Sequence, residues 1–203
     1  MLQIIAKGGI LVIPILFCSI TALAIFFERI IRYAVNQSRG RNIENTVAEL
    51  MEKGEVGKAL ETSEKSNSPM GRVLNRAINA KDLEIKVLES VIVNATETEV
   101  RSLSSYIQAL ATIGNIAPLL GLLGTIIGMI KAFMVIQEMG GKVNAAVLAG
   151  GIWEAMLTTA LGLAVALPAM VAHSYLIAKV DKYEARLRNG AVLFIKAINK
   201  KAV

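Results

Sequence analysis

Four polar side chains lie inside long apolar runs, where a simple membrane anchor needs only aliphatic residues. Thr125 stands in the run 107–136, and the run 145–178 contains Glu154, Thr158 and Thr159. A charged group in hydrocarbon costs about 3 kcal/mol on insertion scales, so its presence there requires a reason. Hydroxyls and a carboxylate at membrane depth are typical of ion pathways. These residues indicate a membrane protein with an active function rather than a simple anchor.

Each of these residues also has a purely structural interpretation. Glu154 lies about ten residues into its run, from where its carboxylate could reach lipid headgroups. Threonine hydroxyls commonly bond the carbonyl four residues earlier in their own helix, which would explain Thr125, Thr158 and Thr159 equally well. Glu154 and Thr158 share a helix face, whereas Glu154 and Thr159 are about 140° apart. We therefore do not expect all of them to face one narrow axis.

Small residues recur on one face of each run, at steps of three and four. In the run 107–136 they are Gly114, Gly121, Thr125, Gly128 and Ala132, with Gly124 beside them, and in the run 145–178 they are Thr159, Gly162, Ala166 and Ala169. Such faces let membrane helices approach closely. The sequence therefore predicts close helix packing through Gly114, Gly121, Gly124, Gly128 and Gly162, with a threonine at the contact or in an enclosed cavity.

The composition is that of an integral membrane protein. The 203 residues are 54% hydrophobic, and the mean hydropathy is +0.55, which is too apolar for an ordinary soluble domain. The net charge of +6 is concentrated at one end. The segment 28–106 has as many acidic as basic residues, whereas 179–203 holds seven Lys or Arg against two acidic residues. This is a positive-inside pattern, and we expect no nucleic acid to bind.

Three apolar runs are long enough to cross a bilayer. The arginines after the first run place the N-terminus outside and the following segment in the cytoplasm, and the third run has the same charge bias at its end. The orientation of the second run follows only from alternation. The prediction is an all-α membrane protein with a periplasmic N-terminus. Its transmembrane helices are expected at 8–27, 107–136 and 145–178, and a periplasmic turn at 137–144 joins the last two. A helical region at 28–106 and a basic C-terminal tail at 179–203 are expected in the cytoplasm.

The region 28–106 is expected to be helical throughout. Gly54 is a candidate C-cap, and Ser68 followed by Pro69 is typical of a helix N-terminus. From Ile85 an apolar stripe recurs at helical spacing, and no glycine or proline interrupts the segment 82–113. We therefore expect one continuous rod that runs from the cytoplasmic region directly into the second span.

Other classes of protein lack the residues that they would need. Cys18 is the one cysteine, so no disulfide can form within a chain and no cysteine metal cluster is possible. His173 is the one histidine. We find no convincing pair of nucleophile and base and no set of metal ligands. The sequence therefore predicts no metal, no cofactor and no enzymatic activity.

Two long motifs resemble the MotA/TolQ/ExbB proton channel family, in particular its three-span ExbB/TolQ branch. The first is ATIGNIAPLLGLLGTIIGMIKAF at 111–133. The second is GIWEAMLTTALGL at 151–163, followed by ALPA at 166–169. Their order and separation match the family, and together they cover about the C-terminal half of the chain.

The resemblance implies a homopentamer in the bacterial inner membrane, with the second and third spans around a central pore. An ExbD/TolR-like single-span partner with a membrane aspartate would occupy the pore, and a TonB/TolA-like protein is a further expected partner. Thr125 and Thr159 carry over as pore-lining threonines, and Glu154 as the acidic residue of the third span. We hypothesise that the two threonines form polar rings around the partner's carboxylate. Glu154 would either take part in the pathway, hold subunits together or shape the outer entrance.

Two alternatives remain open at this point. A structural membrane scaffold would need the small faces but not the hydroxyls. A sodium-driven version of the same motor is the other alternative, because Thr158 adds a hydroxyl where the family commonly has alanine. Nutrient uptake and envelope maintenance are equally compatible with the sequence.

Overall fold

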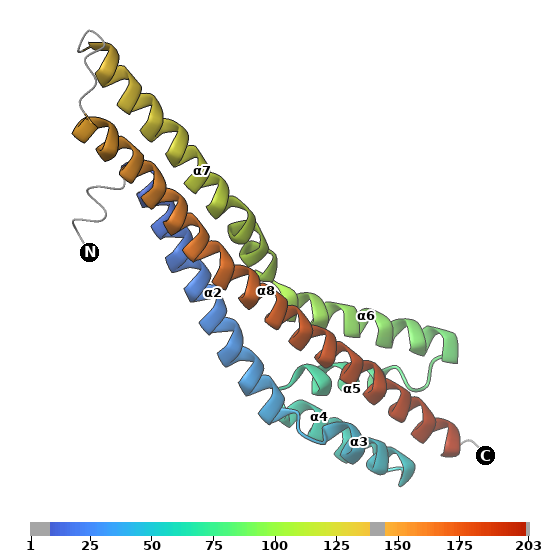
Figure 1. Cartoon of the computed structure of the whole chain (residues 1–203). Helices are drawn as coiled ribbons and strands as arrows, with labels where there is room; N and C mark the ends of the chain where they lie inside the picture. The colour runs from blue at the N-terminus through green and yellow to red at the C-terminus, as the bar shows by residue number, and fades with distance from the viewer. Residues whose placement is uncertain (1–8, 139–144, 202–203) are drawn as a thin grey trace. The chain divides into compact units, whose positions relative to one another are not determined.

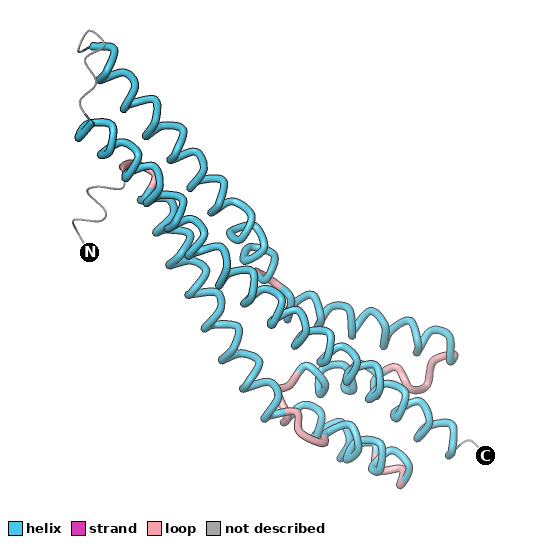
Figure 2. The backbone as a smooth tube through the Cα atoms, in the orientation of Figure 1, coloured by secondary structure: helices cyan, strands magenta, loops and turns pink. Residues whose placement is uncertain are grey.

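The computed structural model describes residues 9–138 and 145–201, and within these ranges it contains helices and no strand (Figures 1 and 2). The elements in chain order are α2 (Val12–Arg39), α3 (Ile43–Glu52), α4 (Val56–Lys65), α5 (Pro69–Asn79), α6 (Ile85–Ser104), α7 (Ile107–Glu138) and α8 (Ala145–Lys201). The all-helical prediction is confirmed for these residues.

The helices form two compact units. One, the span unit, consists of the chain up to residue 27 and residues 106–175. The other, the head unit, consists of residues 28–105 and the chain from residue 176 on. α2 and α8 each contribute residues to both.

The span unit contains the apolar parts of α2, α7 and α8. Three helices of the described chain are long and apolar enough to cross a membrane, and they include these segments. α2 buries Val12 and Ile15 against the unit and exposes Ile13, Phe17 and Ile20. A chain in water would not leave so large an apolar face open, whereas lipid or another protein would cover it. Of the turn expected at 137–144, residues 139–144 lie outside the described residues.

The head unit has a conventional hydrophobic core. Val47, Met70, Leu74, Leu187 and Phe194 are among the side chains that it buries, and they come from α3, α5 and α8. The basic segment after residue 178 therefore belongs to α8, which buries Leu187, Phe194 and Ala197 in this core.

Two local signals in the head unit are confirmed. The Ser68 hydroxyl accepts a hydrogen bond from the Gly71 backbone N–H at 3.1 Å, and Pro69 occupies the first position of α5. Gly54, with φ of 79°, takes the left-handed conformation that ends α3.

The prediction of a continuous rod is wrong, because α6 ends at Ser104 and α7 begins at Ile107. Ser105 is extended, with ψ of 145°, and Tyr106 is left-handed, with φ of 61°. Side chains of α2 hydrogen-bond to the backbone carbonyls that the break leaves open. Arg29 donates to the Ser102 and Leu103 carbonyls at 3.4 and 3.5 Å, and Tyr33 donates to Leu103 at 2.8 Å. These contacts between distant segments replace intrahelical bonds.

Two ion pairs connect distant parts of the head unit. Arg72 Nε and Nη2 lie 2.8 and 2.6 Å from the two carboxylate oxygens of Glu99, which is only 7% exposed. Arg186 binds both oxygens of Glu44 at 2.9 Å, and it also donates to the Gly40 carbonyl. Such bidentate pairs fix geometry as well as charge. They hold α6 to α5 and the C-terminal part of α8 to α3.

Candidate ion-pathway site in the paired spans

α7 and the first half of α8 pack against each other through small residues. A Cβ atom added to Gly162 would lie 2.5 Å from the Ala117 carbonyl oxygen, and one added to Gly121 would lie 2.9 Å from the Thr159 Cα. These distances are to backbone atoms, which cannot move aside cheaply. Gly121 and Gly162 therefore let the two helix backbones come into direct contact.

The other glycines predicted to pack meet side chains of α8. A Cβ at Gly114 would lie 2.6 Å from Met170 Cγ. At Gly124 it would lie 2.3 Å from Thr158 Oγ1, and at Gly128 it would lie 3.2 Å from Ala155 Cβ. The contacts run in opposite directions along the two helices, so α7 and α8 form an antiparallel pair.

Thr158 and Thr159 lie at the centre of this contact, beside the Gly121 carbonyl. Thr159 Oγ1 donates to the Gly121 oxygen at 3.1 Å. Thr158 is 2% exposed, and its shortest hydrogen bond, at 2.7 Å, is to the Ala155 carbonyl in its own helix. Its distance to the Gly121 oxygen, 3.5 Å, is long for a hydrogen bond. Thr159 is thus the threonine whose hydroxyl connects the helices, and Thr158 mainly fills the space left by Gly124.

Thr125 lies in α7, one helical turn from Gly121. Its hydroxyl donates to the Leu122 carbonyl at 2.7 Å, as expected for a threonine that bonds within its own helix. The side chain is half-buried. Among the described residues the structure gives no hydrogen bond between Thr125 and either threonine of α8. Within the described residues of a single chain, the hydroxyl of Thr125 and those of Thr158 and Thr159 therefore bond to carbonyls and not to one another.

Glu154 is paired with a residue that the sequence reasoning did not assign to the site. Its Oε1 atom lies 3.3 Å from Lys131 Nζ. This ion pair joins α8 to α7 one helical turn from Thr158. The sequence contains only a weak signal for this pair, because Lys131 stands six residues before the link 137–144 and Glu154 ten residues after it. In an antiparallel helix pair, residues equally distant from the link lie opposite each other.

No metal centre is evident in residues 9–138 and 145–201, where no three His, Cys, Asp or Glu side chains come together. Between α7 and α8 in the described part of the span unit, the main polar contacts are the hydrogen bond of Thr159 to the Gly121 oxygen and the ion pair of Lys131 with Glu154. Hydroxyl and carbonyl oxygens have lone pairs that can accept hydrogen bonds from water.

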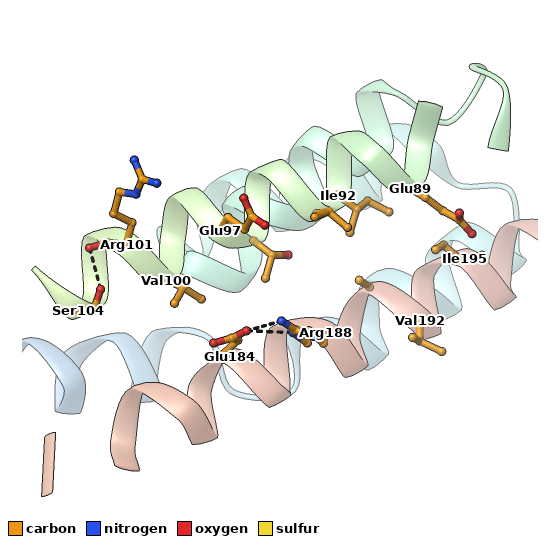
Figure 3. A pocket seen from close by; sticks show the side chains of 13 residues that line it. Glu89, Ile92, Glu97, Val100, Arg101, Ser104, Glu184, Arg188, Val192 and Ile195 are labelled. Carbon is orange, nitrogen blue, oxygen red and sulfur yellow. Dashed lines mark hydrogen bonds and ion pairs between the residues drawn. The ribbon is translucent and has the colours of Figure 1, made fainter. Parts of the chain in front are cut away.

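The head unit has a groove of about 610 Å³ between α6 and α8, shown in Figure 3. Ile92, Val100 and Ile195 contribute apolar lining, and Arg188 forms an ion pair with Glu184 at 2.6 Å on the wall formed by α8. The groove shares no residue with the polar contacts of the span unit.

Residues 65–189 match the MotA/TolQ/ExbB proton channel family, which is a transport family rather than a family of enzymes. The biopolymer transport protein ExbB-like 3 of Synechocystis sp. is 30% identical over 166 residues, which cover 81% of this chain and 79% of the relative. ExbB of Pseudomonas putida is 28% identical over 169 residues, covering 79% of this chain and 51% of the relative.

The Tol-Pal system protein TolQ of Haemophilus influenzae is 34% identical over 109 residues, covering 53% of this chain and 47% of the relative. The chain thus spans about half the length of the Pseudomonas and Haemophilus relatives. The family match extends over more than half of the chain and includes both motifs of the paired spans. This chain belongs to the MotA/TolQ/ExbB proton channel family.

Proposed function

We propose that the chain is the channel subunit of a bacterial inner-membrane motor that uses the proton motive force to energise a periplasmic or outer-membrane process. In this proposal five copies surround a pore, and an ExbD/TolR-like single-span partner with a membrane aspartate occupies it. The N-terminus is periplasmic, and the head unit lies in the cytoplasm. The named functions of the relatives, biopolymer transport and Tol-Pal, are the two classes of process to consider.

The observation that carries this proposal is the position of Thr159. Its hydroxyl proton is directed to the Gly121 carbonyl across a close helix contact, while the side chain is only half-buried. The lone pairs of the hydroxyl oxygen can therefore accept a hydrogen bond from water or a protonated carboxyl group. The close contact between the two helix backbones holds the Thr159 hydroxyl oxygen in place. The proposed polar ring needs such fixed oxygens, because the partner inside it moves.

The assignment of the ionising group to a partner follows from the residues of the spans. The segments 8–27, 107–136 and 145–178 contain no aspartate, and their one acidic residue, Glu154, is paired with Lys131. Side chains of this subunit alone do not form a proton relay through these segments. We infer that Thr125 and Thr159 order water or stabilise charge beside a carboxylate that the partner supplies.

The oligomer is supported by the apolar surface of the single chain. Leu119, Leu122 and Ile126 of α7 and Met156 and Leu163 of α8 are exposed, although they belong to the most apolar segments. Lipid covers part of such a surface, and neighbouring subunits cover the rest in this proposal. Thr125 and Thr159 would then meet across a subunit boundary rather than within one chain.

The test is proton flux in liposomes that contain the chain and its single-span partner. Thr159→Val is expected to lower coupled flux about tenfold or more, because the loss of one hydrogen bond in the transition state corresponds to about 1.4 kcal/mol. Thr21→Val is the matched control, since Thr21 also lies in a span and its hydroxyl bonds only the Phe17 carbonyl of its own helix. Unchanged flux in Thr159→Val, with normal assembly, would reject the proposed role.

The same preparation separates the alternatives. A structural scaffold gives no flux with either ion, and its assembly still depends on Gly121 and Gly162. A sodium-driven motor gives flux under a sodium gradient but not under a proton gradient. The specific observation in favour of this second candidate is the additional hydroxyl of Thr158, which lies next to the Thr159 contact.

A further inference from the structure

The ion pair between Lys131 and Glu154 occurs within one chain, between the two spans that form the close helix contact. The distance from Lys131 Nζ to Glu154 Oε1 is 3.3 Å, and the side chains are 55% and 28% exposed. Both residues lie in apolar segments, where a single charge is costly. Two opposite charges at this distance reduce that cost for each other. The pair therefore has a physical reason to form whether or not an ion is transported.

The surroundings of the Glu154 carboxylate leave little room for a transported ion. A Cβ atom on Gly9, which has φ of 68°, would lie 2.2 Å from Glu154 Oε1, so the backbone before α2 closes one side of the carboxylate. The cavity beside it has a volume of about 10 Å³, and Lys131 and Thr158 are among its lining residues. Such a cavity holds one water molecule at most, and a hydrated cation is larger.

We propose that Lys131 is a positioning residue whose ammonium group holds Glu154 against α7, so that Glu154 serves as a fixed clamp between the two spans rather than as a carrier of the transported ion. The clamp lies one turn from Thr158, whose hydroxyl bonds the Ala155 carbonyl next to Glu154. It therefore fixes the rotation of α8 about its axis, and with it the direction of the Thr159 hydroxyl.

A clamp and a carrier make different demands on the two residues. A clamp needs two opposite charges facing each other, and exchanging the residues preserves it. A carrier needs the carboxyl group itself at position 154. The interpretation of a flux measurement rests on the proposed channel function, whereas the interpretation of thermal unfolding does not.

The experiment compares Lys131→Met, Glu154→Gln and the exchange Lys131→Glu with Glu154→Lys in the purified complex with the partner. Each single change is expected to lower Tm by about 2–4 °C, the shift that corresponds to roughly 1 kcal/mol at this chain length. The exchange is expected to recover at least half of the Tm that a single change loses, and to keep proton flux within about twofold of the unchanged chain. Lys65→Met is the control, because Lys65 pairs with Glu61 on an exposed face of α4.

Two outcomes overturn the proposal. If the exchange recovers Tm but loses flux about tenfold or more, the carboxyl group is needed for ion transfer at position 154. If the exchange recovers none of the loss in Tm, and the neutral double variant Lys131→Met with Glu154→Gln lowers Tm by the sum of its two single effects, the residues are not coupled. The double variant decides the second point even where the exchange fails to fold. Absence of flux in the unchanged complex would reject the proposed function and leave the comparison of Tm values valid.

Discussion

The Tyr33 hydroxyl lies 2.8 Å from the Leu103 carbonyl oxygen and donates to it, which joins α2 to the last turn of α6. Tyr33 lies beyond the apolar run 8–27, and burial raises its pKa to about 12. The phenol therefore keeps its proton and remains a donor at physiological pH. Arg29 donates to the same carbonyl at 3.5 Å, so one backbone oxygen at the end of α6 has two partners from α2.

Tyr33→Phe removes the shorter of these two bonds. We expect the free energy of unfolding to fall by about 1 kcal/mol, because a partly buried carbonyl loses its best donor. Thermal unfolding of the purified chain measures the change. Thr98→Val is a suitable control, since Thr98 is exposed and its hydroxyl bonds only the Asn94 carbonyl of α6. Equal effects of the two substitutions would argue against a role for Tyr33 in holding the end of the helix.

Tyr106 offers a direct test of the break between α6 and α7. At φ of 61° glycine is favoured over alanine, so Tyr106→Gly is expected to be more stable than Tyr106→Ala by about 1 kcal/mol. In a continuous helix the order is reversed, because glycine costs about 1 kcal/mol relative to alanine there. The two variants remove the same tyrosine side chain, so the sign of their difference in stability reports the backbone conformation alone.

Gly162→Ala is expected to weaken the contact between α7 and α8. The new methyl group would lie 2.5 Å from the Ala117 carbonyl oxygen, and the backbones must separate to admit it. We expect a loss of about 1–3 kcal/mol, as for other overpacked sites, together with less assembled complex in detergent. Gly150→Ala in the same helix is the control, because a Cβ there meets no atom within 4 Å in the single chain. Similar losses at both positions would point to a general effect of alanine in α8.

The pair of Arg72 and Glu99 is expected to be the most sensitive polar contact of the head unit. Arg72→Met leaves the buried Glu99 carboxylate without its bidentate partner. The cost should be about 2 kcal/mol, below the 3–5 kcal/mol of a fully buried pair because Arg72 is about half exposed. The stability of Arg72→Lys should lie between that of the unchanged chain and that of Arg72→Met, since an ammonium group cannot bind both carboxylate oxygens as a guanidinium group does. Chemical denaturation gives these values, and recovery of stability in the double variant Arg72→Met with Glu99→Met would identify the unpaired charge as the cause.

Periodicity and local signals were sufficient for much of the fold. The apolar runs indicated the long helices, and the Ser68-Pro69 pair located the start of α5, because such signals depend on neighbouring residues only. The break at Ser105 was missed because no glycine or proline marks it. It depends on donors of α2 that lie 70 and 73 positions away in the sequence. The serines of this segment were a weak local signal, since Ser104 and Ser105 both bond carbonyls three residues earlier.

The site was predictable only in part, for a similar reason. Spacing on one helix indicated which residues are small and which are polar, but not which carbonyl a hydroxyl would reach. That Thr158 and Thr159 both approach Gly121 depends on how closely the two helices pack. Lys131 was not among the predicted site residues, although its position opposite Glu154 gives it a partner inside the span unit.

The opposite charges of Lys131 and Glu154 also bear on how the chain enters the membrane. A lone charge costs about 3 kcal/mol when a helix moves from the translocon into lipid. Helices that enter one after the other meet this cost twice, whereas two helices that enter together meet it with the charges already neutralised. The ion pair therefore favours insertion of α7 and α8 as a helical hairpin, with their close contact formed before lipid surrounds them.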